Sequence, residues 1–232
     1  MYQSLFITGT DTGVGKTVIT GLLGRYLTER GLRAVTQKWI QTGSGACGDI
    51  DVHRRLMKKK KGGGSDPAGP LVPYSFRYPA SPHLAARLEK RNIRPQTIKK
   101  RFRELLDDHD VVVVEGVGGA LVPYAADRLV IDIAKELKMP VLIVAANRLG
   151  AINHTLLTIE AVRARGMRIL GVVFNETSRS RDAVIREDNP AIVRSVSRAK
   201  ILGALRWSTD AETLYRAFRP IGSRIAAQLT RG

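Results

Sequence analysis

The chain has 232 residues but only one cysteine, few aromatic residues and no long hydrophobic run. Because Cys47 has no partner within the chain, the sequence excludes a small secreted fold held together by internal disulfides. No apolar stretch approaches the roughly 20 residues that a membrane-spanning helix requires. The first residues also lack the charged region and the cleavage pattern of a signal peptide. We therefore expect a cytoplasmic protein with no membrane partner.

Acidic residues are scarce relative to basic ones, 21 against 38, which gives a formal net charge of +17. Such a charge raises the possibility of a nucleic-acid or anionic-membrane partner. The basic residues are scattered, however, and the one dense run, 58–61, has no interleaved aromatic residues on which bases could stack. This run leads into a stretch rich in glycine and serine, so we interpret 58–73 as a mobile, solvated insertion. We expect no nucleic-acid partner.

Short apolar runs alternate with longer amphipathic stretches along the chain. Most runs are apolar at consecutive positions, which is typical of strands buried on both faces of a parallel sheet. The expected strands are 4–8, 34–37, 111–114, 141–145, 169–174 and 201–205. The expected helices are 16–29, 82–90, 95–106, 128–137, 153–165 and 210–229. The pattern predicts an α/β fold with a doubly wound, mostly parallel sheet, forming one domain over residues 1–232.

The segment 9–17 reads GTDTGVGKT between the first predicted strand and the first predicted helix. In such a turn, backbone N–H groups point at phosphate oxygens, and the helix dipole adds positive charge. Gly15, Lys16 and Thr17 match the end of the phosphate-binding motif G-x-x-x-x-G-K-[ST], although Thr10 fills the first glycine position. Lys16 can reach the β- and γ-phosphates, and the Thr17 hydroxyl can hold Mg²⁺. The segment predicts a variant P-loop within the P-loop nucleoside triphosphate hydrolase fold.

Polar residues follow several of the predicted strands. Lys38 comes directly after 34–37, Glu115 opens the sequence EGVGG, and Asn175 ends the strand 169–174. In doubly wound sheets, ligands bind beyond the carboxyl ends of the strands, so we expect these residues to form one site. There, the Lys38 ammonium could neutralise a transferring phosphoryl group, although a surface lysine is the alternative interpretation.

Carboxylates near this edge are candidates for binding Mg²⁺. Glu115 has the position from which P-loop proteins hold this ion, directly or through water; the alternative is a carboxylate that faces solvent. Asp49 and Asp51 follow a glycine-rich loop, and either could complete the metal site or cap a helix.

Five motifs occur in the order found in dethiobiotin synthetases, and together they resemble that family over most of the chain. They are GTDTGVGKT, Lys38 with Thr42-Gly43, PASPH at 79–83, VEGVGG around Glu115, and LGAINH at 149–154. The resemblance implies an ATP- and Mg²⁺-dependent ligase of biotin biosynthesis. Its substrates would be ATP, CO₂ and 7,8-diaminononanoate (7,8-diaminopelargonate). The ureido ring of dethiobiotin would close through a carbamate and a carbamic-phosphoric anhydride, with release of ADP and phosphate.

The resemblance also implies roles for the residues at matching positions. Lys38, Thr12 and Lys16 would act at the reacting phosphate and carbamate, with Lys38 bridging the two. The residues contacting ATP would be Gly13, Val14, Gly15, Lys16, Thr17, Val18, Asp51, Glu115, Gly116, Val117, Gly118, Asn175 and Arg206. The residues contacting the diamine or its carbamate would be Thr12, Lys38, Thr42, Val117 and Gly118. Mg²⁺ would bind Thr17, Asp51 and Glu115.

Other parts of the family pattern concern the second subunit and the adenine ring. Backbone N–H groups of Ala151, Ile152 and Asn153 would bind the substrate carboxylate from the partner subunit, so that a homodimer shares each site. Asn175 would hydrogen-bond adenine, although a turn asparagine is the alternative. Two residues replace a usual proline: Trp39, which we expect to reshape the wall beside Lys38, and Arg206, which leaves the nucleotide preference open.

Two other functions are compatible with the same loop. Glutamine-dependent amidoligases, such as cobyrinate diamide synthase and CTP synthase, append a glutaminase domain with a nucleophilic cysteine, whereas Cys47 lies in no G-x-C-x-G elbow. The other alternative is a nucleotide-switched ATPase that binds DNA or membrane. The partition and septum-site ATPases of this kind carry a signature lysine at the position of Asp11. Diamine-dependent turnover of ATP would separate the ligase from this alternative.

Overall fold

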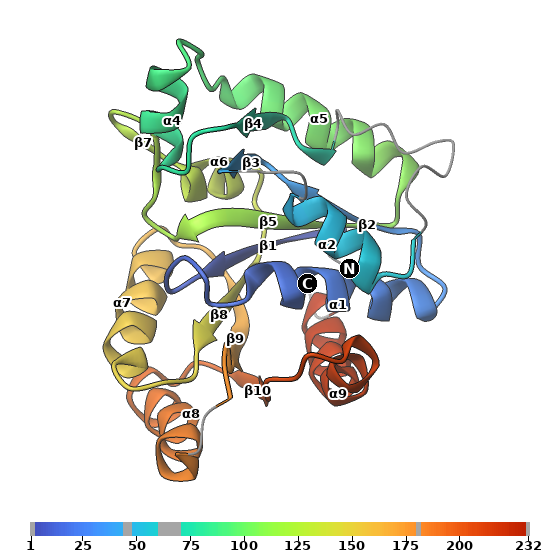
Figure 1. Cartoon of the computed structure of the whole chain (residues 1–232), viewed down its shortest axis with the longest axis vertical. Coiled ribbons are helices and arrows are strands. Elements are labelled where there is room, and N and C mark those ends of the chain that lie inside the picture. The colour runs from blue at the N-terminus through green and yellow to red at the C-terminus, as the bar shows by residue number, and fades with distance from the viewer. Residues whose placement is uncertain (1–2, 44–47, 60–70, 180–181, 231–232) are drawn as a thin grey trace.

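A six-stranded parallel sheet forms the centre of the computed structural model, which describes residues 3–43, 48–59, 71–179 and 182–230 (Figure 1). Its strand order is β10-β9-β8-β1-β5-β2, and every neighbouring pair is parallel. The strands are β1 (Ser4–Gly9), β2 (Ala34–Lys38), β5 (Val111–Gly119), β8 (Val141–Ala146), β9 (Ile169–Asn175) and β10 (Ile201–Leu205). The predicted α/β fold is confirmed, and five of the six strands end within one residue of their expected bounds. β5 continues through the glycines after Glu115.

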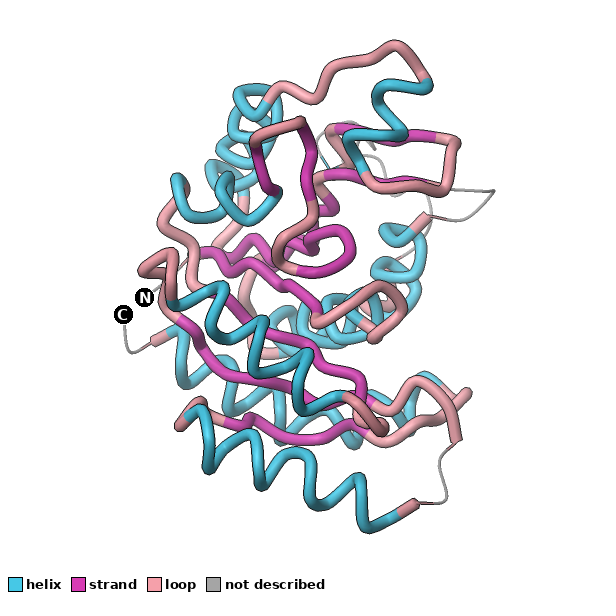
Figure 2. The backbone as a smooth tube through the Cα atoms, turned by 90° about the vertical axis from the view of Figure 1, so that its left-hand side faces the viewer, coloured by secondary structure: helices cyan, strands magenta, loops and turns pink. Residues whose placement is uncertain are grey.

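Helices cover both faces of this sheet (Figure 2). Because side chains alternate along a strand, Leu5 and Ile7 of β1 face one core, whereas Phe6 faces the other. The helices on the Leu5 side are α1 (Lys16–Glu29), α2 (Asp49–Leu56) and α9 (Ala211–Leu229). Those on the Phe6 side are α4 (Pro82–Leu88), α5 (Pro95–Asp108), α6 (Val130–Glu136), α7 (Ala151–Arg163) and α8 (Ala183–Ser197). The consecutive apolar residues of the strands thus fill two cores.

Several elements differ from the sequence-based expectations. α2 has only eight residues, and α8 contains Pro190, which removes a helical hydrogen bond, so neither helix is evident in the sequence. Two small sheets pair β3 (Ile40–Thr42) with β4 (Tyr74–Phe76), and β6 (Pro123–Ala125) with β7 (Arg128–Leu129). The strand β7 occupies the start of the range predicted as the helix 128–137. Among the described residues, no helix is long and apolar enough to cross a membrane.

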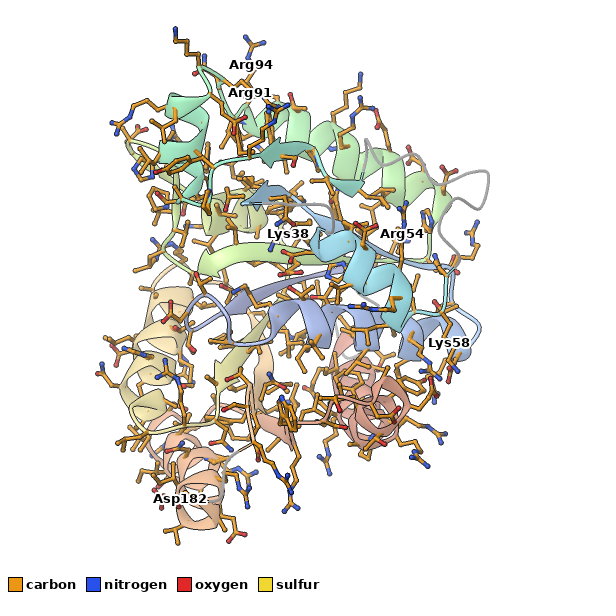
Figure 3. The ribbon with its side chains drawn as sticks, in the orientation of Figure 1. Lys38, Arg54, Lys58, Arg91, Arg94 and Asp182 are labelled. Atoms are coloured by element: carbon orange, nitrogen blue, oxygen red, sulfur yellow. The ribbon has the colours of Figure 1, made fainter. Side chains whose placement is uncertain are left out.

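The basic side chains are spread over the molecule. Figure 3 shows Arg91 and Arg94 near α4 and α5, whereas Lys58 lies beyond the end of α2. Lys58 forms an ion pair with Glu212 of α9 at 3.0 Å. Most of the predicted insertion, 60–70, lies outside the described residues, as does Cys47.

The helix α2 packs closely against α1, and this contact positions it over the carboxyl edge of the sheet. A Cβ atom on Gly21 of α1 would lie 2.9 Å from the Cβ of Leu56. A Cβ atom on Gly24 would lie 2.7 Å from the sulfur of Met57. Side chains at these positions would therefore push the helices apart.

Trp39 points away from the ligand-binding edge and into the core. Its indole is fully buried and stacks on Phe6, with ring centroids 5.2 Å apart. Its Nε1 donates a hydrogen bond to Oε1 of Gln37. The expectation that Trp39 reshapes the wall beside Lys38 is therefore wrong, because the side chain following Lys38 packs on the opposite side of the strand.

We expect Trp39→Ala to lower the free energy of unfolding by about 3–5 kcal/mol, because it leaves a cavity beside Phe6. Denaturant unfolding followed by circular dichroism measures this change. Trp207→Ala is a matched control: Trp207 is 40% exposed, so its truncation should cost less than about 1 kcal/mol. Equal losses in the two variants would contradict the structural role of the Trp39 stack.

Candidate active site

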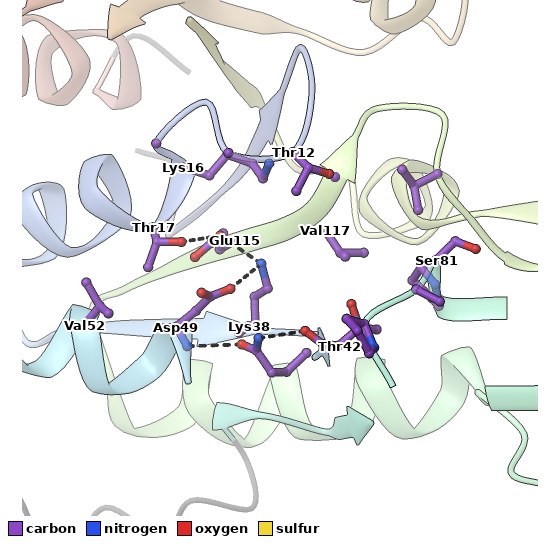
Figure 4. A pocket seen from close by; sticks show the side chains of 18 of the residues that line it. Thr12, Lys16, Thr17, Lys38, Thr42, Asp49, Val52, Ser81, Glu115 and Val117 are labelled. Atoms are coloured by element: carbon purple, nitrogen blue, oxygen red, sulfur yellow. Dashed lines mark hydrogen bonds and ion pairs between the residues drawn. The ribbon is translucent and has the colours of Figure 1, made fainter. Parts of the chain in front are cut away.

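A cavity of about 810 Å³ lies at the carboxyl edge of β1, β2 and β5 (Figure 4). Its wall contains most of the residues predicted to bind ATP or substrate. These are Thr12, Gly13, Gly15, Lys16, Thr17, Val18, Lys38, Thr42, Glu115, Val117 and Gly118. The wall also contains Asp49, the second candidate for the metal site, and residues to which no role is assigned from sequence: Gln41, Val52, Pro79, Ala80, Ser81, Pro82 and Val122. The fold therefore brings together segments that are far apart in the chain.

The glycine-rich loop forms one end of the cavity. Gly13 and Gly15 have positive φ angles of 74° and 95°, a region that glycine adopts readily. A Cβ atom on Gly15 would also lie 2.1 Å from Nδ2 of Asn175. Directly after this loop, α1 begins at Lys16, and its cap residue has no side chain to satisfy the first backbone N–H groups. This arrangement suits a phosphate group.

Lys16 extends across the loop, and its Nζ donates to the backbone oxygen of Asp11 at 2.9 Å. Burial, together with the positive charge of Lys38, lowers the pKa of Lys16 to about 8. The nearby carboxylates Glu115, Asp49 and Asp11 oppose this shift only in part. A phosphate anion beside Lys16 would stabilise the charged form.

Lys38 and Glu115 form a buried ion pair between neighbouring strands. They are register partners on β2 and β5, and Nζ of Lys38 lies 2.8 Å from Oε1 of Glu115. The same ammonium lies 2.8 Å from Oδ2 of Asp49 and donates to the backbone oxygen of Gly116. Burial alone would lower the pKa of Lys38, but Glu115 and Asp49 outweigh it, so the pKa is raised. Lys38 is therefore a fixed cation at neutral pH.

Glu115 is fully surrounded by donors. Burial alone would raise its pKa, but Lys38 and a hydrogen bond from His53 outweigh burial and lower the pKa to about 2. Oε1 of Glu115, the oxygen that contacts Lys38, also accepts a hydrogen bond from the hydroxyl of Thr17 at 3.0 Å. Figure 4 shows Thr17, Lys38, Asp49 and Glu115 converging on one region of the cavity.

The oxygen atoms in this region suit Mg²⁺. Thr17, Asp49 and Glu115 supply a hydroxyl and two carboxylates, which are the hard ligands that this ion prefers. Within the described part of the chain, no three His, Cys, Asp or Glu side chains form a complete metal site. Mg²⁺ commonly binds one or two carboxylates and takes its remaining ligands from substrate phosphates and water, so the residues present fit a metal bound together with a nucleotide.

The two aspartates of α2 have different positions. Asp49 lines the cavity and contacts Lys38, whereas Asp51 accepts a hydrogen bond from the backbone N–H of Gly48 at 3.1 Å. Asp51 therefore caps its own helix. It lies outside the cavity wall, and Asp49 occupies the place at which Asp51 is expected.

His53 also belongs to the site, although nothing in the sequence singles it out. Its ring is completely buried, and Nε2 lies 2.8 Å from Oε2 of Glu115. A lone histidine on a short polar helix is not distinctive, and only the packing of α2 reveals its partner. Gln41 is similar, because its Oε1 accepts the backbone N–H of Asp49 at 3.1 Å.

The remaining predicted residues lie outside the cavity wall. Val14 is buried, and its backbone oxygen accepts a hydrogen bond from Nδ2 of Asn175 at 3.0 Å. Gly116 packs against Phe6, whose ring would lie 2.7 Å from an added Cβ atom. Arg206 follows β10 and is exposed. The segment 151–153 forms the first residues of α7, as expected, but does not line this chain's own cavity.

A parallel sheet whose first strand leads through a glycine-rich loop into a helix defines the class of P-loop nucleoside triphosphatases. Residues 3–213 match a family model described as an AAA domain. The chain is 42% identical to the ATP-dependent dethiobiotin synthetase BioD of Chlorobaculum tepidum, over 84% of this chain and 82% of that protein. It is 39% identical to the enzyme of the same name from Anaeromyxobacter dehalogenans, over 98% of this chain and 99% of that protein. The chain belongs to the ATP-dependent dethiobiotin synthetase family, as the sequence motifs predict.

Solved structures with a similar fold are more distant in sequence. The MinC:MinD cell division protein complex of Aquifex aeolicus matches with a TM-score of 0.59 at 16% identity, over 99% of this chain and 95% of that chain. The structure of pNOB8 ParA bound to nonspecific DNA matches with a TM-score of 0.59 at 14% identity, over 100% of this chain and 99% of that chain. At these identities the likeness shows a common fold and nothing about function.

We expect nucleotide binding to take up protons at about pH 8. At that pH roughly half of the Lys16 side chains are neutral, and phosphate favours the ammonium, so uptake should approach about half a proton per site. Calorimetric titration with Mg·ADP in buffers of different ionisation enthalpy measures this number. Lys16→Arg, which stays charged, should bind with almost no uptake. Equal uptake by this variant would contradict the assignment to Lys16.

Proposed function

We propose that the chain closes the ureido ring of dethiobiotin from 7,8-diaminononanoate, CO₂ and ATP. The observation that carries this proposal is the Lys38 cluster in a chain of this family: a fixed ammonium, held by Glu115 and Asp49, lies beside a phosphate-binding loop in one cavity. The named relatives are ATP-dependent dethiobiotin synthetases. A ligase of this type needs an ATP site and a substrate site that share a cation.

The glycine-rich loop and Lys16 would bind the phosphates of ATP. The first N–H groups of α1 and the Lys16 ammonium would supply the donors and the positive charge for these phosphates. Mg²⁺, held by Thr17, Asp49 and Glu115, would neutralise phosphate charge. These residues would also orient the γ-phosphate toward Lys38.

Lys38 would act between the two anions that must meet. One amine of the diamine combines with CO₂ to form a carbamate and releases a proton. The carbamate oxygen then attacks the γ-phosphorus of ATP, and ADP leaves. The ammonium of Lys38 offsets the repulsion between carbamate and phosphate, and its raised pKa means that it acts through charge rather than by accepting a proton. Thr12 and Thr42, in the same wall, would hydrogen-bond the substrate.

Phosphorylation turns the carbamate oxygen into a good leaving group. The second amine can then attack the carbonyl carbon, and the new C–N bond closes the ring. Phosphate leaves with the electron pair of the C–O bond, and the attacking nitrogen loses one proton to phosphate or solvent. Val117 and Gly118, near the end of β5 in the cavity wall, would hold the chain of the diamine against this centre.

The adenine ring would lie beyond the ends of β9 and β10. Asn175 and Leu205 are register partners there, and Arg206 follows. Nδ2 of Asn175 donates one of its two N–H groups to Val14, so the other N–H group and the carbonyl oxygen could both meet the base. An acceptor at this position suits the amino group of adenine.

We also infer that two copies of the chain associate through the surface beside the start of α7. Leu121, Leu149 and Leu157 are more than half exposed there, although leucine is normally buried. A cavity of about 330 Å³, lined by Leu121, His154 and Leu157 among others, adjoins the end of β5. A second copy covering this apolar surface could present its own segment 151–153 to the substrate carboxylate.

We expect phosphate release from Mg·ATP and bicarbonate to depend on 7,8-diaminononanoate, with dethiobiotin detected by mass spectrometry. Lys38→Met should abolish ring closure and retain Mg·ADP binding, because the P-loop remains intact. A rate of ATP hydrolysis that is indifferent to the diamine would overturn the proposed function. It would favour the nucleotide-switched ATPase, and salt-sensitive DNA binding would then support that alternative.

We expect Leu157→Glu to weaken the dimer and to raise KM for the diamine at least tenfold, because the charge is placed on the inferred contact surface. Sedimentation velocity and steady-state kinetics measure the two effects. Leu88→Glu is a matched control, with 52% exposure against 55% for Leu157, but on α4. If the Leu157→Glu protein sediments like the unsubstituted chain, the inferred interface is wrong.

A further inference from the structure

His53 is a buried polar residue beside the cavity that neither the sequence motifs nor the proposed chemistry assigns. Its exposed fraction is 0%, and Nδ1 has no hydrogen-bond partner within the described part of the chain. An ionised carboxylate can only accept, so Nε2 donates to Glu115. Because a buried, unpaired nitrogen costs stability, folding alone would favour an apolar residue here.

The two oxygens of the Glu115 carboxylate have different partners. Oε1 accepts from Lys38 at 2.8 Å and from Thr17 at 3.0 Å. Oε2 lies 2.8 Å from His53. A carboxylate held only through Oε1 could rotate about its side chain, whereas bonds at both oxygens fix its plane. The bond to His53 therefore determines where Oε1 lies relative to Lys38 and Thr17.

The placement of His53 follows from the helix that carries it. Asp49 and His53 are four residues apart, so they share one face of α2. That face lies against the carboxyl edge of the sheet because α2 packs closely on Gly21 and Gly24 of α1. One helix thus contacts both members of the ion pair: Asp49 touches Lys38, and His53 touches Glu115.

We propose that His53 is a positioning residue for the transfer of phosphate. It orients Glu115 so that Oε1 holds the Lys38 ammonium and the Thr17 hydroxyl at the place where the γ-phosphate and its cation bind. The role is one of geometry, since His53 does not line the cavity. The inference rests on the proposed function for its kinetic consequence, but its consequence for nucleotide binding does not depend on the identity of the substrate.

The test compares His53→Leu with His53→Gln. Leucine fills the space without a donor, whereas the Nε2 of glutamine can reproduce the bond to Glu115. We expect His53→Leu to lower kcat roughly tenfold, with KM for the diamine changed less than about twofold. Without substrate, the Mg²⁺ concentration needed for half-maximal ADP binding, measured by calorimetry, should rise by about the same factor. His53→Gln should recover most of both losses, and thermal unfolding should show that both variants are folded.

His109→Leu is the matched control, because His109 precedes β5 at the opposite edge of the sheet and should leave both measurements unchanged. Unchanged kcat and Mg²⁺ dependence in His53→Leu would overturn the inference. Equal losses in the leucine and glutamine variants, accompanied by a lower Tm, would also overturn it in favour of a purely structural histidine. If the unsubstituted chain shows no diamine-dependent activity, the proposed function fails, while the ADP titration still tests the orientation of Glu115.

Discussion

The buried contact between Lys38 and Glu115 is the interaction on which the rest of the cavity depends. Two opposite charges out of water gain little stability as a pair, because desolvation offsets their attraction unless further hydrogen bonds satisfy both groups. Here Lys38 also contacts Asp49 and Gly116, and Glu115 also accepts from Thr17 and His53. These four partners hold the ammonium and the carboxylate in fixed positions. A phosphoryl-transfer site requires charges fixed in this way.

The positive charges of Lys16 and Lys38 have different partners in the cavity. Lys38 contacts two carboxylates and has a raised pKa, whereas Lys16 has a backbone oxygen as its close partner and a pKa of about 8. Phosphate therefore gains most from Lys16, whose ammonium contacts no carboxylate within the described part of the chain. The free protein keeps Lys38 in place with its own carboxylates.

Local patterns were sufficient to predict the sheet, the glycine-rich loop and Lys38. Buried parallel strands are apolar at every position, and residues directly after them must meet at one edge. The same reasoning could not separate Asp49 from Asp51, because both lie in the first turn of a helix of only eight residues, whose orientation depends on glycines in α1. It could not identify His53 for the same reason. Trp39 was misread because the residue after Lys38 packs on the opposite side of the strand, on Phe6, a contact that depends on the register of three strands.

The solved structures with a similar fold indicate which part of this chain can be specific to its function. These structures align with nearly the whole of this chain at low sequence identity. The sheet and helices alone therefore do not distinguish a ligase from other P-loop proteins. The difference must lie in side chains at the carboxyl edge. Lys38 at the end of β2 and Asp49 on α2 place a buried ammonium in the same cavity as the glycine-rich loop. Because α2 packs on α1, the helix that begins at the phosphate loop, one close helix contact connects this loop with the helix that carries Asp49 and His53.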